Sequence, residues 1–176
     1  MSSTATLIDR NRQFAQTFDS ADLPILPRLR TVLLTCGDAR VDPAHLFELE
    51  LGDAVVIRNN GGRVTSEVEN EIAALAFLVA QMDGGTPGPF ELLIVQHTQC
   101  GAERFADPAL QHALKQRIGV DVSPSAISDH ESSLREDIAR LKNSSKIPGY
   151  IVASGYIYDV RDGSVRQVIP PAPLSD

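Results

Sequence analysis

The sequence predicts an α/β fold in which a central, mostly parallel β-sheet is flanked by helices and closed by a late C-terminal strand or hairpin. Three observations support this prediction. Apolar runs at residues 31–35, 54–57 and 90–95 are typical of strands that are buried on both faces. Helical patterns separate these runs, and each run ends in a polar cluster. Because ligands of open α/β sheets collect at the carboxyl ends of the strands, we expect the three clusters to meet at one end of the sheet.

The first third of the chain is expected to contribute two helices. Apolar residues recur at roughly helical spacing over residues 8–18, which predicts a helix that packs on another surface. After the first strand, Asp42 is followed by Pro43, which is typical of a helix start with Asp as the cap and Pro in the first turn. One or two helical turns are expected over residues 44–49.

The longest predicted helix covers Ser66–Met82. Ser66 and Glu69 have the spacing of a capping box, and apolar residues recur along one face of this segment. Asp83 and two glycines then end the helix.

Two helices and two strands are expected after the third strand. The helices lie within residues 109–141, on either side of Ser123-Pro124. Residues 151–160 and 165–169 form the strands, which a hairpin turn through Arg161-Asp-Gly163 would join. The last seven residues, PPAPLSD, predict an arm or a disordered end.

The composition is that of a soluble globular protein, with 43% hydrophobic and 22% charged residues. A formal net charge of −7 and a pI near 5.0 argue against nucleic acid or an anionic membrane as the main partner and leave small-molecule substrates. The N-terminus lacks the pattern of a secretory signal, and no apolar stretch is long enough to span a bilayer, so we expect a cytoplasmic protein. In that compartment two cysteines are more often metal ligands or free thiols than a disulfide.

Three side chains are candidate metal ligands. His97 and Cys100 share a loop that directly follows an apolar strand, and Cys36 follows another. One nitrogen and two sulfurs suit Zn²⁺, and three protein ligands leave one position open for water. The alternative is a pair of buried, inert cysteines, but the position of all three residues at strand ends favours one Zn²⁺ per subunit.

The length of 176 residues suits one compact domain. We expect a single zinc-binding α/β domain over residues 1–170, of which residues 1–28 form an N-terminal helical arm. Residues 171–176 are expected to be a C-terminal tail.

Asp38 and Arg40 are candidate catalytic residues because they lie within four residues of Cys36. An ion pair between them would keep Asp38 ionised and hold its carboxylate in one orientation. Asp38 would then accept the hydrogen bond of a water whose pKa Zn²⁺ lowers toward neutrality. Two alternatives remain open at this point: a structural salt bridge in a turn, and Asp38 as a fourth zinc ligand that closes the site.

Several further polar or glycine positions could contact a substrate or anion near the metal. The candidates are Gly101, through its backbone amide, Asn59 and Gly61. Arg58, together with Asn59, is equally suited to positioning the motif loops. The other three histidines lie in polar or helical contexts and are expected at the surface, namely His45, His112 and His130.

The segments Cys36-Gly-Asp-Ala-Arg40 and His97-Thr-Gln-Cys100-Gly101 together resemble the signature of the β-class carbonic anhydrases. The stretch from Gly52-Asp53 to Arg58-Asn-Asn-Gly61 is similar to a third block of that family, so the resemblance spans about residues 31–104. It implies a central parallel sheet, Zn²⁺ on the three ligands named above and an Asp38–Arg40 dyad. It further implies a homodimer or homotetramer whose active sites lie near the subunit interface.

Two departures from the family pattern bear on the substrate. Ala39 stands where many members have Ser, and Asn60-Gly61-Gly62 stands where many have Ala-Gly-Asn. The Gly-Gly form also occurs in relatives that hydrolyse carbonyl sulfide or carbon disulfide. The resemblance implies a lyase that hydrates carbon dioxide reversibly to bicarbonate by a zinc-bound hydroxide. The Gly-Gly form leaves carbonyl sulfide or carbon disulfide hydrolysis as the alternative. A non-catalytic zinc-binding or bicarbonate-binding protein with Asp38 on the metal is an alternative of another class.

Overall fold

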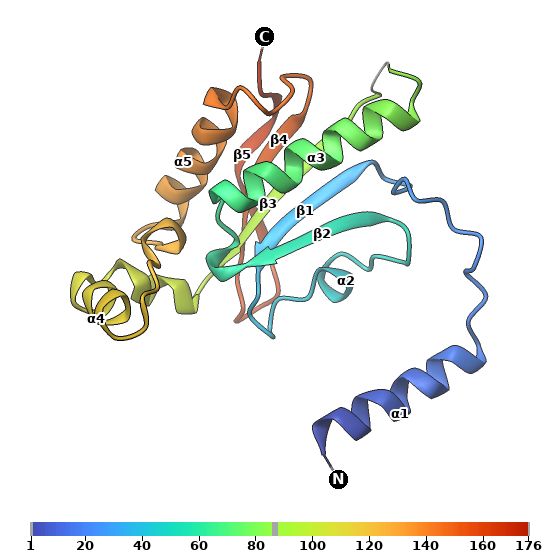
Figure 1. The fold of residues 1–176 in the computed structure, drawn as a ribbon, viewed down its shortest axis with the longest axis horizontal. Coiled ribbons are helices and arrows are strands. Elements are labelled where there is room, and N and C mark those ends of the chain that lie inside the picture. The colour runs from blue at the N-terminus through green and yellow to red at the C-terminus, as the bar shows by residue number, and fades with distance from the viewer. Residues whose placement is uncertain (1, 86–87, 176) are drawn as a thin grey trace.

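The computed structural model describes residues 2–85 and 88–175, and its centre is a five-stranded sheet in the order β2-β1-β3-β4-β5 (Figure 1). The first four of these strands in spatial order run parallel, and β5 is antiparallel to β4. This confirms the predicted mostly parallel α/β sheet with a late antiparallel strand. The strands are β1 (Thr31–Cys36), β2 (Ala54–Asn59), β3 (Glu91–His97), β4 (Val152–Tyr158) and β5 (Val165–Pro173).

The parallel register brings the carboxyl ends of three strands together. Cys36 at the end of β1 pairs with Asn59 at the end of β2, and Thr35 pairs with Val95 near the end of β3. Every residue of β1 after Thr31 is buried, as the continuous apolar run predicts. The polar clusters that follow these strands therefore lie at one edge of the sheet.

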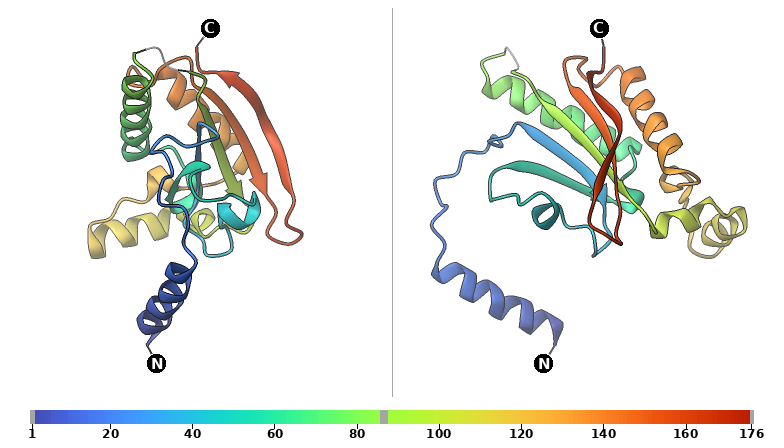
Figure 2. Two further views of the ribbon diagram at one scale, coloured as in Figure 1. Left: turned by 90° about the vertical axis from the view of Figure 1, so that its right-hand side faces the viewer. Right: turned by 180° about the vertical axis from the view of Figure 1, so that it is seen from behind.

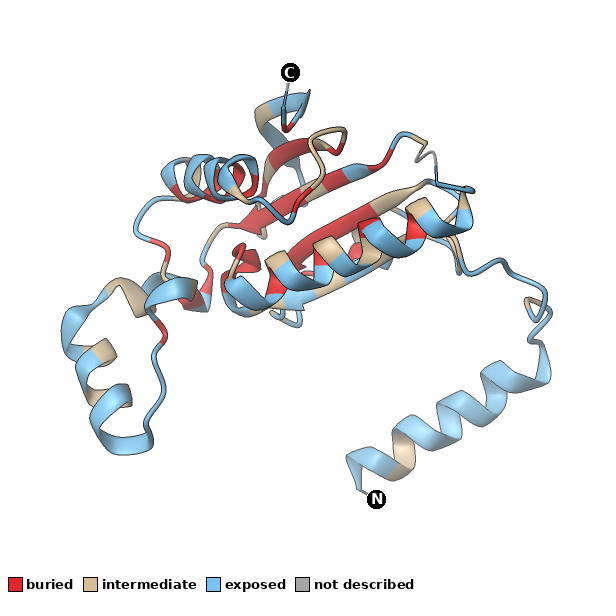
Figure 3. Ribbon diagram, turned by 45° about the horizontal axis from the view of Figure 1, so that its top comes forward, coloured by how far each residue is buried: buried red, intermediate tan, exposed pale blue. Residues whose placement is uncertain are grey.

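Two long helices, α3 (Ser66–Met82) and α5 (His130–Asn143), cover one side of the sheet (Figure 2). Their apolar residues form the main core with alternate residues of β1 and β3, and Figure 3 shows the buried residues concentrated in this layer. A smaller cluster around Leu33 and Val41 includes Leu46 of the short helix α2 (Pro43–Leu46). The core residues contributed by the two long helices are Val68, Ile72, Ala76, Val79, Leu134, Ile138 and Leu141.

Helix α3 has the predicted bounds, but its N-cap lies one residue before the predicted one. Thr65 is the N-cap, and its side chain accepts a hydrogen bond from the amide of Val68 at 3.5 Å. The predicted capping box of Ser66 and Glu69 is therefore wrong. The carboxylate of Glu69 instead accepts a hydrogen bond from the hydroxyl of Ser144 at 2.6 Å.

The two helices predicted around Ser123-Pro124 are confirmed as α4 (Pro108–Ile118) and α5, with a 3₁₀ turn at Ser123–Ser125 between them. Asp107 caps α4 and Asp129 caps α5 through their side-chain oxygens. Across residues 2–85 and 88–175, no helix combines the length and apolar character needed to cross a bilayer.

The C-terminal segment was expected to be an arm or a disordered end, and most of it lies in the sheet instead. Strand β5 continues to Pro173, and Leu174 is only 5% exposed. The amide of Leu174 donates to the carbonyl oxygens of Gly149 and Ile151, both at 3.0 Å. The prolines of this segment are tolerated because β5 is an edge strand, where a missing N–H breaks few ladder hydrogen bonds.

Helix α1 (Ser3–Gln16) projects away from the sheet (Figures 1 and 3). It begins earlier than the expected range of residues 8–18, and it ends before Phe18. None of its residues is buried, and the apolar side chains of Leu7, Ile8 and Phe14 are 48–60% exposed. The surface on which this helix was expected to pack is therefore not provided by the described part of the chain.

Candidate metal centre

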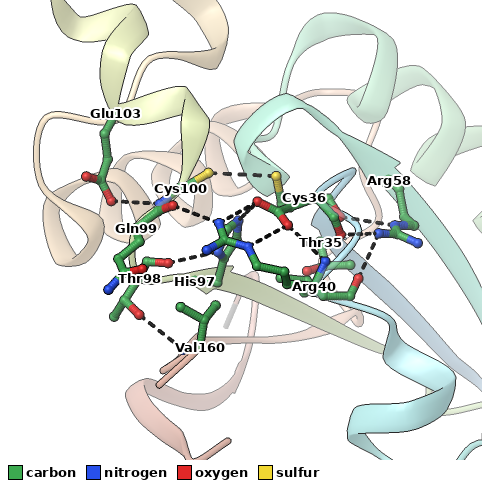
Figure 4. Close-up of polar contacts among 12 residues, drawn as sticks. Thr35, Cys36, Arg40, Arg58, His97, Thr98, Gln99, Cys100, Glu103 and Val160 are labelled. Atoms are coloured by element: carbon green, nitrogen blue, oxygen red, sulfur yellow. Dashed lines mark hydrogen bonds and ion pairs between the residues drawn. The ribbon is translucent and has the colours of Figure 1, made fainter. Parts of the chain in front are cut away.

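The three candidate ligands converge at the carboxyl edge of the sheet (Figure 4). Cys36 ends β1, His97 ends β3, and Cys100 follows in the next loop. Their ligand atoms lie within 4.8 Å of one another, and all three residues are buried. The strand order places them together, because β1 and β3 are adjacent and parallel.

The imidazole of His97 is oriented for metal binding. Its Nδ1 lies 3.0 Å from the carbonyl oxygen of Thr98, so the Nδ1–H donates to that oxygen and Nε2 keeps its lone pair. Nε2 is buried and has no hydrogen-bond partner among the residues that the structure describes. A buried nitrogen without a partner is unfavourable, and a metal ion would compensate for it.

The two sulfurs have the spacing of ligands on one ion. Sγ of Cys36 and Sγ of Cys100 lie 3.7 Å apart. Two sulfurs bound tetrahedrally at the usual Zn–S distance of about 2.3 Å are about 3.8 Å apart. The hydrogen bond between them lowers the pKa of the Cys36 thiol and raises the pKa of the Cys100 thiol, because the first thiolate accepts the proton of the second thiol. A cation between the sulfurs is needed for both to be thiolates.

Asp38 and Arg40 form a bidentate ion pair beside these ligands. Nε of Arg40 donates to Oδ1 of Asp38 at 3.0 Å and Nη2 donates to Oδ2 at 2.7 Å, while the Arg40 amide donates to Oδ1 at 2.9 Å. These hydrogen bonds hold the pKa of Asp38 well below its usual range. Oδ2 lies 3.9 Å from Nε2 of His97, so an ionised carboxylate faces the metal ligands.

Arg58 stabilises the loop that contains Asp38 by hydrogen bonds to its backbone. Its Nε donates to the carbonyl oxygen of Cys36 at 3.0 Å, and its Nη2 donates to the carbonyl oxygens of Asp38 and Val41, both at 2.7 Å. These contacts fit the positioning role that the sequence allowed for Arg58. The guanidinium spans the whole turn from β1 to the start of α2.

The glycine pair after β2 allows a close approach to β1. Gly61 and Gly62 have φ values of +80° and +62°. A Cβ atom on Gly62 would lie 3.0 Å from the carbonyl carbon of Thr35 and 3.1 Å from the backbone nitrogen of Cys36. Asn59 stabilises this turn, because its side chain donates to the carbonyl of Arg63 at 2.7 Å and accepts from the Arg63 amide at 3.0 Å.

A cavity of about 560 Å³ lies next to Cys36 and Asp38. Gly61 and Gly101, two of the predicted substrate-contact positions, line it. Asn59, the third, is directed to the backbone of Arg63, and it is Asn60 that lines the cavity. The rest of the lining is mostly apolar, with Ala102, Phe105, Leu110 and Leu114, and it includes one cationic side chain, Arg104.

A second group of polar residues, Gln96, Glu103 and His130, contacts the loop from His97 to Cys100. The sequence did not predict this group. His130 was expected at the surface, yet only 17% of its side chain is exposed and it contacts Gln96 and Glu103. The expectation holds for His45 and His112, which are exposed. The three-residue spacing from Cys100 to Glu103 could have indicated a cap, whereas no local signal connects His130 to this loop.

Comparisons with known proteins agree on one family. The sequence model described as carbonic anhydrase matches residues 31–149. Beta-carbonic anhydrase 1 of Mycobacterium tuberculosis is 27% identical over 172 residues, which cover 97% of this chain and all of the relative. A carbonic anhydrase structure from Streptococcus mutans is 38% identical, with a TM-score of 0.77 and coverage of 96% of this chain and 98% of that one. A carbon disulfide hydrolase of Saccharolobus solfataricus is 28% identical, covering 78% of this chain and 76% of its own length.

Proposed function

Because this chain belongs to the β-carbonic anhydrase family, whose members are carbonate dehydratases, we propose that it catalyses the zinc-dependent, reversible hydration of carbon dioxide to bicarbonate. The observation that carries the proposal is the buried triad of Cys36, His97 and Cys100 with an ionised Asp38 beside it. This arrangement combines a soft ligand set with an acceptor for a water's hydrogen bond.

Zn²⁺ is the metal that fits the triad best. The unpartnered Nε2 of His97 and the two sulfurs at 3.7 Å match a tetrahedral ion with one open position. When bound there, Zn²⁺ would supply the positive charge that makes a water nucleophilic near neutral pH.

The role of Asp38 is to orient the nucleophile. Its carboxylate is held by three hydrogen bonds from Arg40, so it remains ionised and cannot rotate freely. It accepts the hydrogen bond of the attacking water, which directs the oxygen lone pair toward the carbon of the substrate. Gly61 and Gly101 leave room beside Cys36 for the substrate.

The walls of the cavity favour a small uncharged substrate. Phe105, Leu110 and Leu114 offer little to an ion but suit carbon dioxide, which is apolar and linear. Arg104 also lines the cavity, so the charged product bicarbonate meets one cationic side chain among these apolar walls.

Hydrolysis of carbon disulfide or carbonyl sulfide is the second candidate. The observation that favours it is the group of relatives named carbon disulfide hydrolase, which are 25–28% identical to this chain. The same nucleophile would attack the same carbon atom. The carbonic anhydrase of M. tuberculosis covers 97% of this chain and the hydrolases cover 78%, so we place carbon dioxide first.

A non-catalytic protein in which Asp38 closes the metal site is a less favoured alternative. Both carboxylate oxygens of Asp38 are engaged by Arg40, at 3.0 and 2.7 Å. Asp38 would have to give up at least part of this ion pair to become a zinc ligand, so the geometry supports the open site.

We propose that the protein is a homodimer or homotetramer. Helix α1 has an exposed apolar face and contacts no core, which suits packing on a second copy of the chain. One structural relative, from Sordaria macrospora, is described as tetrameric. A cytoplasmic location is part of the same proposal, because two metal-binding thiols have to stay reduced.

The proposal is tested by stopped-flow hydration of carbon dioxide with a pH indicator. Protein treated with a chelator should lose activity and regain it with one equivalent of Zn²⁺, and a metal-free preparation with full activity would refute the proposal. Parallel assays with carbonyl sulfide and carbon disulfide decide between the two substrate classes. His97→Ala should abolish metal binding, while His45→Ala, at a histidine with an 87% exposed side chain, is the matched control and should change nothing.

A further inference from the structure

We propose that His130 is a positioning residue that, through Gln96 and Glu103, holds the loop from His97 to Cys100 in the geometry for binding metal. The inference rests on the proposed function only in requiring that the triad binds a metal ion. It concerns a residue that touches neither the ligand atoms nor the cavity beside Asp38.

The imidazole of His130 contacts the start of the ligand loop. Its Nδ1 lies 2.9 Å from Oε1 of Gln96, the residue directly before His97 in β3. Gln96 is fully buried, with an exposed fraction of 0%. Its side chain is therefore fixed by packing, and the contact with His130 fastens the end of β3 to the start of α5.

The other ring nitrogen contacts the end of the same loop. Nε2 of His130 lies 3.1 Å from Oε1 of Glu103. The same oxygen accepts the backbone N–H of Cys100 at 3.0 Å (Figure 4). A carboxylate is an acceptor, so Nε2–H donates to it. One imidazole thus connects the residue before the first loop ligand with the backbone of the second.

The loop between these two anchors needs external support. It contains no glycine, and Gln99 has a φ of +56°, a left-handed conformation that is unfavourable for a residue with a side chain. Such a conformation persists only when the surroundings hold it. The middle of the loop is also held at Thr98, whose amide donates to the carbonyl oxygen of Tyr158 at 2.9 Å. Loss of the contacts with Gln96 and Glu103 would therefore loosen the two ends of the loop, where His97 and Cys100 lie.

His130 itself is firmly placed. It is the first residue of α5, directly after the cap residue Asp129, whose Oδ1 accepts the amide of Ser132 at 2.8 Å. The cavity that His130 lines is formed with Glu103, Ala106, Ile127 and Ser128, and it is separate from the one lined by Cys36 and Asp38. This separation assigns His130 to positioning and excludes direct contact with a substrate in the cavity beside Asp38.

The test measures metal release, which does not depend on activity. Zn²⁺ transfer from the loaded protein to a chromogenic chelator should be about 10- to 100-fold faster in His130→Ala than in the unchanged chain, as is usual when a residue supporting a metal ligand is lost. The Co²⁺-substituted variant should show altered sulfur-to-cobalt absorption bands. His112→Ala, at an exposed histidine of α4, is the matched control and should release metal at the original rate.

Two further variants separate positioning from folding. His130→Gln can still reach Glu103, so its release rate should fall between those of the unchanged chain and His130→Ala. Because Glu103 contacts the Cys100 amide directly and His130 acts partly through Glu103, the double variant Glu103→Ala with His130→Ala should release metal little faster than Glu103→Ala alone. Equal release rates for His130→Ala and His112→Ala would overturn the proposal. A zinc-loaded protein without activity on carbon dioxide would overturn the proposed function instead and leave this inference standing.

Discussion

The guanidinium of Arg40 donates to the carbonyl oxygen of Gln99 at 3.0 Å, and so connects the loop after β1 to the loop after β3 (Figure 4). The same Nη2 donates to Oδ2 of Asp38 at 2.7 Å. Arg40 therefore fixes the Asp38 carboxylate relative to the backbone between His97 and Cys100. The ion pair and the metal ligands form one unit, although they come from segments about sixty residues apart.

Arg40→Lys should lower kcat for carbon dioxide hydration about 100-fold while the zinc content stays the same, because small losses of orientation have costs of that size. Lysine keeps the charge but cannot reach both carboxylate oxygens and the Gln99 carbonyl at once. Stopped-flow kinetics with metal analysis of the same samples would check this.

The chain contains a matched control for that variant. Arg30, directly before β1, makes a bidentate contact with Asp83 at 2.6 and 2.8 Å, at the end of β1 away from Cys36. Arg30→Lys should therefore leave kcat near its original value. Equal losses in both variants would show that the Asp38–Arg40 pair has no special role.

Gly62→Ala should lower the free energy of unfolding by about 2 kcal/mol or more, since it adds left-handed strain to a steric overlap. The new Cβ would lie within 3.1 Å of backbone atoms of Thr35 and Cys36, which cannot rotate away. Gly163→Ala is the control: it has a φ of +77° and open space around it, so only the backbone strain of about 1 kcal/mol remains. Urea unfolding of both variants would measure the difference. Equal losses of unfolding free energy would show that the close approach of Gly62 to β1 adds nothing to the backbone strain.

Leu174→Ala should destabilise the protein by about 2–5 kcal/mol, as for other buried leucines. Leu174 is part of the main core and is 5% exposed, although it is the third residue from the end of the sequence. Leu51→Ala, at a leucine that is 54% exposed, should change the stability by about 0.5 kcal/mol or less. A negligible effect of Leu174→Ala would contradict the packing of this segment and support the prediction of an arm or a disordered end.

Local sequence was sufficient to predict the features that depend on chain order. The apolar runs that end in Cys36 and His97 predict both the strands and the edge where the ligands meet, because parallel neighbours share a carboxyl edge. The helix cap was one residue off, since Thr65 and Ser66 are both good N-cap residues and only the contact with Val68 distinguishes them.

The features that the sequence did not predict depend on contacts between residues that are far apart in the chain. His130 reads as a polar residue at a helix start, and only folding brings it to Gln96, 34 residues earlier. The prolines of 170–173 are typical of a loop, yet an edge strand accepts them, and pairing with β4 decides the outcome.

The buried pair of Arg63 and Asp137 predicts a component of stability that falls as the pH rises. Nε of Arg63 donates to Oδ2 of Asp137 at 2.9 Å, and the Asp137 residue is 2% exposed. Burial raises the pKa of Asp137 to about 6 although Arg63 opposes the change. A carboxyl whose folded pKa exceeds its unfolded value of about 4 stabilises the fold fully below pH 4, and this contribution is lost as the pH rises through 6.

Asp137→Asn removes the titrating group, so the difference in unfolding free energy between the original chain and the variant should fall by about 2 kcal/mol between pH 4 and pH 7.5. Comparing the two proteins at each pH cancels the effects of the other carboxylates and of metal release, which both proteins share. Denaturant unfolding at several pH values measures this difference directly. If the two stability curves run parallel, Asp137 is ionised throughout, and the attraction of Arg63 outweighs the cost of burying the carboxylate.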